Sequence, residues 1–171
     1  MGDSKNETIR FVISRYDAYF NLANVKASLL VTTNGVLLGV AITAFISLYE
    51  KSSHLEWITQ IKVLLSLSVL FILLSSYNSL KVIFSYLKTG NRCADYHSFI
   101  FFGSVREIER NTYVEKFGSL SDQELLNDLI EQAHILAVGL SKKYLNLNYS
   151  TIYTGISVLL ICIVGLVLYW S

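Results

Sequence analysis

Residues 27–49 read ASLLVTTNGVLLGVAITAFISLY, which is an uncharged stretch of 23 residues between Lys26 and Glu50. A helix needs about 20 predominantly apolar residues to cross the roughly 30 Å hydrocarbon layer of a bilayer. This stretch is long enough, and no charged side chain interrupts it. It therefore predicts a transmembrane helix, which makes the chain an integral membrane protein.

Two later stretches have the same character. Residues 62–82 contain 18 consecutive uncharged residues, from 63 to 80, and Lys62 at their edge can extend its ammonium group toward the headgroups. Residues 151–170 carry no charge at all. The sequence thus predicts three transmembrane helices, at 27–49, 62–82 and 151–170.

Two alternatives to spanning helices fit the sequence less well. A signal peptide places its apolar run within about the first 15–30 residues, whereas residues 1–26 are amphipathic and charged. The buried helices of a soluble core can be equally apolar. However, 53% hydrophobic residues and a mean hydropathy of +0.47 leave too little polar chain to cover three such runs.

Lysine and arginine are distributed unevenly outside these stretches. Residues 50–62 hold two of the 14, and residues 1–26 and 81–150 hold the other twelve. Positive charge remains on the cytoplasmic side of a membrane. We therefore predict that the segments 1–26 and 83–150 are cytoplasmic, and that the short loop 50–61 and the C-terminus are external.

The composition also limits the functions open to the chain. The net charge is +1, and eight acidic residues balance eight basic ones between positions 81 and 150, so no basic surface for nucleic acid is predicted. Cys93 and Cys162 lie at different levels, and no group of residues has metal-ligand spacing. No catalytic motif is recognised, so we expect neither an enzyme nor a cofactor, with an unrecognised active site as the alternative.

The periodicity outside the spans is helical. Residues 4–49 and residues 122–170 each read as one long helix, because the chain contains no proline to stop either of them. Ser4 to Glu7 and Ser121 to Glu124 have the pattern of capping boxes at the helix starts. By contrast, residues 95–108 are rich in aromatic β-formers and predict an extended or hairpin-like segment.

The predicted fold is therefore an all-α integral membrane fold. Two of the three transmembrane helices are continuous with long cytoplasmic helices, and a short extended aromatic segment accompanies them. One protomer has little mass to cover the apolar faces of its cytoplasmic helices, so we expect a homo-oligomeric bundle.

Polar and small residues within the first span suggest how helices pack. Asn34 and the hydroxyl side chains of the other spans either line a pore or form hydrogen bonds between helices. Gly35 and Gly39 form a face of small residues that suits close approach of another helix.

Three segments resemble the transmembrane Pycsar effectors. Residues 16–30 lead into Thr33-Asn34-Gly35 in the manner of that family's first helix, and Phe101 to Val105 resemble its aromatic-Phe-Gly-polar-aliphatic motif. Residues 132–145 are similar to its closing helix. The chain departs from the family pattern at Asn24-Val25, where Asp-Ser is common, and at Ser104, where Asp is common.

This resemblance implies an antiphage effector of the bacterial inner membrane. In such a system a neighbouring cyclase makes cyclic CMP or cyclic UMP during infection. The effector binds this cyclic pyrimidine mononucleotide on its cytoplasmic side and disrupts the membrane lipid bilayer, which causes abortive infection. The alternative is a non-enzymatic membrane adaptor or structural protein whose cytoplasmic helices recruit a partner.

A cyclic mononucleotide needs a cation or an amide nest for its phosphate and an aromatic surface for its base. The cytoplasmic segment offers both types of group close together in sequence. The candidate ligand-binding residues are Phe101 and Phe102, the amides of Gly103 and Ser104, and the flanking Arg92 and Arg106. Lys143 and Arg15, near the membrane, are the next candidates for the phosphate.

Overall fold

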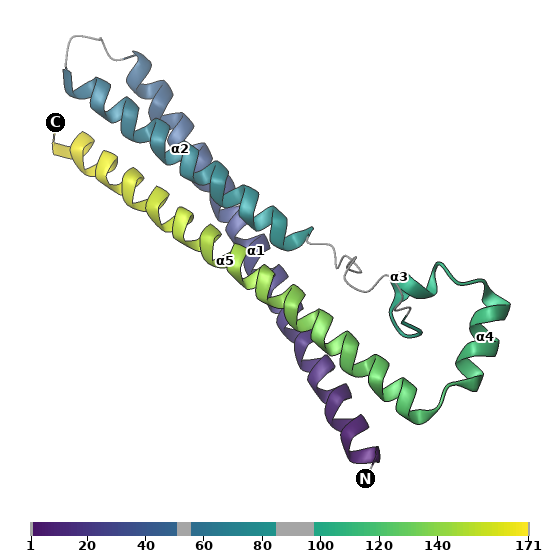
Figure 1. Ribbon diagram of the computed structural model, residues 1–171. Helices are drawn as coiled ribbons and strands as arrows, with labels where there is room; N and C mark the ends of the chain where they lie inside the picture. Colours follow the sequence, from purple (N-terminus) through teal and green to yellow (C-terminus); the bar gives the residue numbers. More distant parts are fainter. Residues whose placement is uncertain (1, 51–55, 85–97, 171) are drawn as a thin grey trace. The chain divides into compact units, whose positions relative to one another are not determined.

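The computed structural model describes residues 2–50, 56–84 and 98–170, and the regular structure in these residues is entirely helical. Along the chain lie α1 (Gly2–Glu50), α2 (Glu56–Ile83), α3 (Phe102–Val105), α4 (Arg110–Ser119) and α5 (Asp122–Trp170) (Figure 1). Three of these helices, α1, α2 and α5, are long and apolar enough to cross a membrane. The predicted all-helical fold with three such helices is confirmed.

The two long helices are continuous, as predicted. α1 and α5 have 49 residues each, which corresponds to about 74 Å at 1.5 Å per residue. The capping box at the start of α5 is present: the Glu124 amide donates to Ser121 Oγ (3.3 Å), and the Ser121 amide donates to Glu124 Oε2 (2.8 Å). The Ser121 amide and the Ser121 hydroxyl (2.7 Å) both donate to the Glu124 carboxylate, which holds the pKa of this carboxyl below its usual value.

The capping box predicted at Ser4 is wrong. α1 already begins at Gly2, so Ser4 lies inside the helix, where its carbonyl oxygen accepts a hydrogen bond from the Thr8 hydroxyl (2.7 Å). A serine followed by glutamate three residues later marks a helix start only where the preceding backbone leaves the helix.

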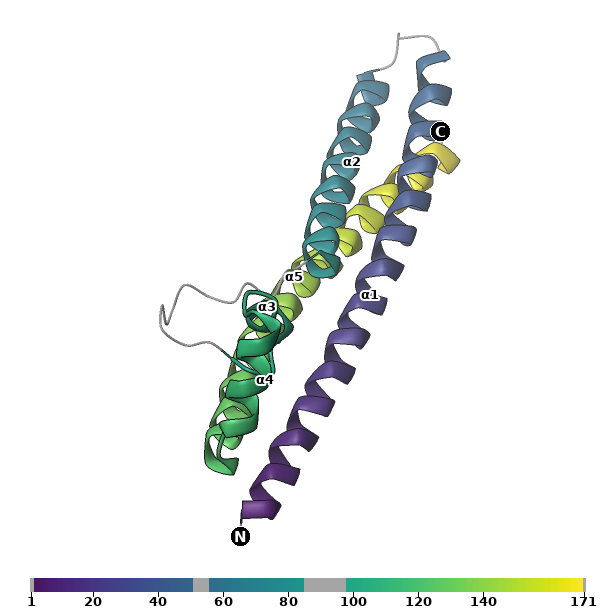
Figure 2. The same ribbon diagram turned by 90° about the vertical axis from the view of Figure 1, so that its right-hand side faces the viewer.

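The chain forms two compact units. The first comprises Met1–Asn21 and Tyr86–Lys142, and the second comprises Leu22–Ser85 and Lys143–Ser171. Within the second unit, α2 lies alongside α5 and the second half of α1 (Figures 1 and 2). This unit contains the three apolar stretches, so it holds the candidate membrane-spanning part.

The core of the second unit follows a heptad pattern. The buried positions of α2 are spaced alternately by three and four residues: Ile58, Ile61, Leu65, Ser68, Ile72, Ser75, Ser79 and Val82. Such a 3-4 repeat keeps one face of a helix in register with its neighbours, as in a coiled coil. Apolar clusters occupy the two ends of this core: Ala23, Ala27, Val82 and Leu147 at one, and Leu48, Ile61, Leu65 and Val164 at the other.

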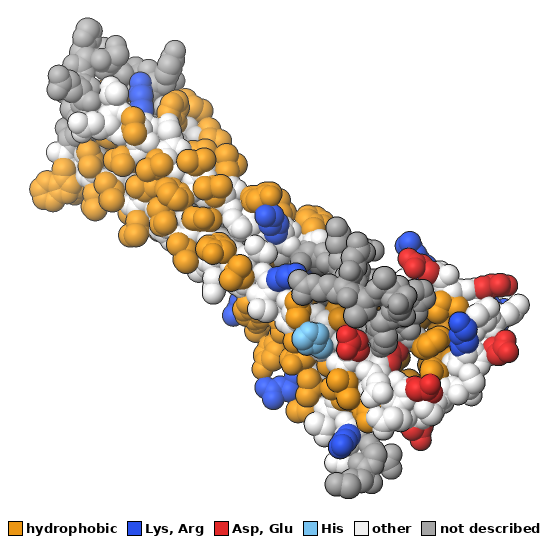
Figure 3. All heavy atoms as spheres, in the orientation of Figure 1, with side chains coloured by type: hydrophobic (Ala, Val, Ile, Leu, Met, Phe, Trp, Pro, Cys, Tyr) orange, Lys and Arg blue, Asp and Glu red, His pale blue; other side chains and the backbone are white. Residues whose placement is uncertain are grey.

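The outward faces of this unit are apolar. Hydrophobic side chains cover the visible surface of α2 and of the second half of α5 (Figure 3). Exposed large hydrophobic residues include Val36, Val40, Ile46, Val63, Leu70, Leu73, Leu159, Ile163 and Leu166. Several hydroxyl and amide groups lie inside, between the two apolar clusters, whereas the outer surface is largely hydrocarbon, unlike the surface of a soluble protein. This distribution suits a lipid environment.

The pairing of α2 with α5 bears on where the third span begins. Ser150 contacts Ser75 on α2. Ser75 lies seven residues before Val82, the last residue of the second predicted span, and is therefore about 10 Å inside that span. The boundary at residue 151 stays a prediction, but this contact favours an earlier start of the third span, near Tyr144.

Candidate functional site

The centre of the second unit contains a group of buried polar side chains from all three helices. Asn34 on α1 and Ser75 on α2 are at most 1% exposed, and Thr154 on α5 is 8% exposed. The Asn34 amide nitrogen donates to Ser75 Oγ (2.8 Å), and the Thr154 hydroxyl donates to Asn34 Oδ1 (3.0 Å). The Ser75 and Thr154 hydroxyl oxygens are 2.7 Å apart.

The Thr154 hydroxyl donates its one hydrogen to an amide oxygen, so in the contact between Thr154 and Ser75 only Ser75 has a hydrogen to offer. The Ser75 hydroxyl shares that hydrogen between Thr154 Oγ1 and the Ser150 carbonyl oxygen. Each of the three side chains contacts the other two. We call this closed circuit of Asn34, Ser75 and Thr154 the polar ring; it joins one residue from each long helix.

Two further serines extend the polar ring along α2 and α5. Ser150 Oγ lies 2.8 Å from Ser75 Oγ and 2.5 Å from Ser79 Oγ, and it is 3.0 Å from the Ser75 carbonyl oxygen. The Ser75 hydroxyl also lies 2.9 Å from the Ser150 carbonyl oxygen. The sequence left two roles open for Asn34, lining a pore or forming hydrogen bonds between helices. In the structure its side chain forms hydrogen bonds between helices.

Gly35 and Gly39 are not close to another helix in the part of the chain that the structure describes. A Cβ atom added to either glycine would meet no other atom within 4 Å. The small-residue face predicted from the sequence is therefore open in the single chain, which leaves it accessible to another helix.

In the first unit, the segment before α3 is held from two sides. Asp128 on α5 accepts a hydrogen bond from the Phe99 amide (2.9 Å), and the Tyr113 hydroxyl on α4 donates to the Phe99 carbonyl oxygen (2.9 Å). Asp128 is only 6% exposed. Ser98 Oγ accepts from the amides of Ile100 (3.1 Å) and Phe101 (2.9 Å). We call this arrangement the Phe99 clamp, after the residue whose amide and carbonyl groups Asp128 and Tyr113 hold.

The extended or hairpin-like structure predicted for residues 95–108 is wrong over its second half. Residues 95–97 lie outside the described residues, 98–101 are non-helical, and Phe102–Val105 form the helical turn α3. The Phe101 carbonyl oxygen accepts from the amides of Ser104 (3.0 Å) and Val105 (3.0 Å). The Ser98 bonds turn the chain into this conformation, so local hydrogen bonding overrides the β-propensity of the aromatic residues.

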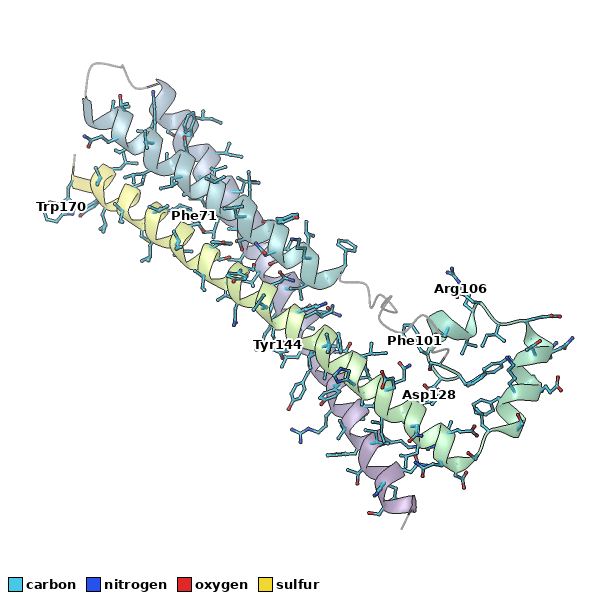
Figure 4. The ribbon with its side chains drawn as sticks, viewed as in Figure 1. Phe71, Phe101, Arg106, Asp128, Tyr144 and Trp170 are labelled. Atoms are coloured by element: carbon cyan, nitrogen blue, oxygen red, sulfur yellow. The ribbon has the colours of Figure 1, made fainter. Side chains whose placement is uncertain are left out.

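The predicted ligand residues of this segment lie close together in the sequence, but they differ in whether a ligand could reach them. The Phe101 ring packs over Gly103, where an added Cβ would lie only 2.5 Å from Phe101 Cε1, so the close approach requires glycine. The Ser104 amide already donates within the turn, and its side chain is buried. Arg106 is exposed and points away from the helix that carries Asp128 (Figure 4).

The remaining predicted cations and aromatic residue have different positions. Arg92 lies outside the described residues, as does the side chain of Phe102. Arg15, in the first unit, donates to the Tyr19 hydroxyl (2.9 Å) and lies over the Phe11 and Tyr19 rings, 5.8 and 5.9 Å from their centroids. Arg15 is therefore engaged along its own helix.

Lys143, in the second unit, is only 4% exposed. Its ammonium group donates to Asn24 Oδ1 (2.8 Å) on α1 and to the Val82 carbonyl oxygen at the end of α2. Burial lowers the pKa of the Lys143 amine. The contacts described for Lys143 and Arg15 lie within separate units, so we assign them no common site.

Three of the residues that form these sites carry no distinctive sequence signal. Thr154 resembles the other hydroxyl residues of the spans, and Asp128 and Tyr113 resemble ordinary surface residues of a helix. The heptad spacing of Ser68, Ser75 and Ser79 among apolar positions is the one signal that places hydroxyls on the buried face of α2.

The chain matches a known protein family. A model of the PycTM family, described as the Pycsar effector protein domain, matches residues 8–170 of the chain. No curated protein and no solved structure matches it significantly. The match covers both units, all three long apolar helices and the segment around α3. Together with the buried polar groups and the apolar outer surface of the second unit, this match identifies a membrane protein. The chain belongs to the PycTM family of Pycsar effector proteins.

Proposed function

We propose that this protein is a non-enzymatic antiphage effector of the bacterial inner membrane. It binds cyclic CMP or cyclic UMP on the cytoplasmic side and permeabilises the bilayer, which causes abortive infection. Membership of the Pycsar effector family, over residues 8–170, is the observation that carries this proposal. The function is coupled to a nucleotide cyclase that supplies the ligand.

The proposed orientation places the first unit in the cytoplasm and the C-terminus outside. The excess of lysine and arginine in residues 1–26 and 81–150 supports it. α5 supports a link between ligand binding and the membrane, because one uninterrupted helix carries both Asp128 of the Phe99 clamp and Thr154 of the polar ring.

A homo-oligomer is part of the proposal. The first unit exposes large apolar side chains that no lipid would cover in this orientation, among them Phe11, Val114, Phe117 and Ile130. Exposed apolar patches of this kind mark protein interaction surfaces. A second copy of the chain is the occupant that we propose, and a cytoplasmic partner protein would instead favour an adaptor function.

Replacing Gly39 by leucine should weaken the oligomer without disturbing the protomer. The single chain has open space around Gly39, so leucine fits there, whereas a second helix packed on this face would be pushed away. We expect association to weaken by about 1–3 kcal/mol per contact, the usual cost of an overpacked interface. The measurement is the mass of the detergent-purified protein.

Gly165→Leu is the matched control, because Gly165 also has open space around it but belongs to α5, whereas the small-residue face belongs to α1. This variant should keep the wild-type mass. An unchanged mass for Gly39→Leu would exclude the Gly35–Gly39 face as the contact between copies.

Nucleotide binding by the detergent-purified protein tests the proposed function. Isothermal titration with a panel of cyclic mononucleotides should detect binding of cyclic CMP or cyclic UMP and none of cyclic AMP. Arg106→Ala and Arg92→Ala should each weaken binding at least tenfold, because a charge-assisted contact to phosphate contributes more than a neutral bond. Arg110→Ala, on the neighbouring α4, removes an exposed arginine outside the predicted site and should bind normally. Wild-type affinity in both Arg92 and Arg106 variants would place the phosphate site elsewhere.

A further inference from the structure

Lys143 connects the three long helices at one end of the second unit. α5 carries the lysine, α1 supplies the Asn24 amide oxygen at 2.8 Å, and α2 supplies the carbonyl oxygen of Val82. The lysine is 4% exposed and Val82 is fully buried. One ammonium group therefore joins the three helices, at the level where the first predicted span begins and the second one ends.

The position of the Val82 carbonyl gives this contact its strength. α2 ends at Ile83, and the carbonyl groups of a last helical turn have no partner inside their own helix. Their partial negative charge attracts a cation, and a hydrogen bond from an ammonium group is stronger than one from a neutral donor. Lys143 thus acts as the C-terminal cap of α2, although it belongs to a different helix.

The cost of breaking the contact also depends on burial. If the ammonium group is removed, the Val82 carbonyl loses a donor at a fully buried residue, and the partly buried Asn24 amide oxygen loses one as well. A buried acceptor without a partner costs more than its hydrogen bond contributes. The Val82 carbonyl regains a donor from water only if this end of the bundle separates.

We propose that Lys143 is a positioning residue that holds the three spans closed at their cytoplasmic end, as a latch with Asn24 and Val82. Opening of the latch accompanies activation, and this part rests on the proposed function. Lys143 in this role is not the phosphate ligand. Its ammonium group is already committed to two oxygens of the protein.

The latch predicts an order among variants. Lys143→Met removes the donor, and Asn24→Leu removes one acceptor, so both should open the bundle end. Lys143→Arg keeps the charge with a different shape and should be intermediate. Asn24→Asp replaces a neutral acceptor with a carboxylate, which makes an ion pair with the ammonium group and should close the end more firmly.

Spin labels report this opening without any nucleotide. Exposed Lys26 and Lys81 lie beside Asn24 and Val82 and are replaced by labelled cysteines, after Cys93→Ser and Cys162→Ser. Distances between the labels are measured by pulsed electron resonance in vesicles. The ratio of open to closed forms should rise about tenfold in Lys143→Met and in Asn24→Leu, the scale of one lost charge-assisted bond. Asn24→Asp should narrow the distribution relative to wild type.

A wild-type distance distribution in both Lys143→Met and Asn24→Leu would overturn the latch. A broader distance distribution in Asn24→Asp than in wild type would also overturn the latch. Because Asn24→Asp adds an interaction, it tests the proposal even if Lys143→Met fails to fold. Dye leakage from the same vesicles separates the two proposals. If the label distances increase in these variants but no dye leaks, the latch proposal holds and the proposed membrane permeabilisation is contradicted. If the label distances do not change, the latch proposal is rejected, whatever the effect of the nucleotide.

Discussion

Replacing Asn34 by leucine is expected to lower the free energy of unfolding of the membrane-spanning bundle by about 2 kcal/mol. The substitution removes both bonds that Asn34 makes in the polar ring, to Ser75 and from Thr154. Each hydroxyl then lacks one partner in a buried site, and an unsatisfied buried group costs about 1–3 kcal/mol. The remaining contact between Ser75 and Thr154 offsets part of this loss.

Unfolding in mixed detergent micelles measures this effect. Asn78→Leu is the matched control, because the Asn78 amide bonds to the Leu74 carbonyl oxygen of its own helix and makes no described contact with another helix. It should change the stability little. A loss for Asn34→Leu no larger than that for Asn78→Leu would show that the polar ring does not hold the helices together.

A combined variant tests whether the polar ring acts as a unit. Asn34→Leu, Ser75→Ala and Thr154→Val together remove the donors and acceptors of the ring at once. Replacing all partners of a hydrogen bond by apolar groups is far less costly than orphaning one of them. We therefore expect the triple variant to lose less stability than the sum of its three single substitutions.

Replacing Asp128 by alanine is expected to release the segment that carries the predicted ligand residues. The carboxylate of Asp128 is buried and accepts the Phe99 amide, two residues before Phe101. Without it, hydrogen exchange of the Phe99 amide should accelerate at least tenfold, because a bond to a charged acceptor contributes about 1.5–3 kcal/mol. Nucleotide affinity should fall as well, since Phe101 is no longer positioned.

Graded substitutions separate the carboxylate from the rest of the Phe99 clamp. Asp128→Asn keeps an oxygen acceptor without the charge and should lie between wild type and Asp128→Ala. Tyr113→Phe removes a single hydroxyl group, which holds the carbonyl group of Phe99, and should also accelerate exchange of the Phe99 amide. Glu131→Ala, an exposed carboxylate on α5, should leave exchange unchanged. Equal exchange in Asp128→Ala and Glu131→Ala would contradict the role of Asp128.

The local chemistry of the chain determined most of the helical structure. Three uncharged stretches predicted three long apolar helices, and the absence of proline predicted that α1 and α5 run on beyond them. The capping box at Ser121 placed the start of α5 correctly, because its two bonds join residues only three positions apart. The same pattern at Ser4 failed, and α3 formed where aromatic residues predicted extended chain, because neighbouring backbone decides whether such local signals apply.

The sequence by itself thus determined the membrane class, the helices and their length, because apolar periodicity and helix breakers act over a few neighbouring residues. Only the tertiary structure decided which polar groups meet. Asn34 bonds to residues 41 and 120 positions away, and Lys143 bonds to one 119 positions away. These pairings depend on the register between packed helices, and a shift of one residue turns a side chain by about 100° away from its partner. A lysine that the sequence places among membrane-edge cations is for this reason a buried cap of another helix.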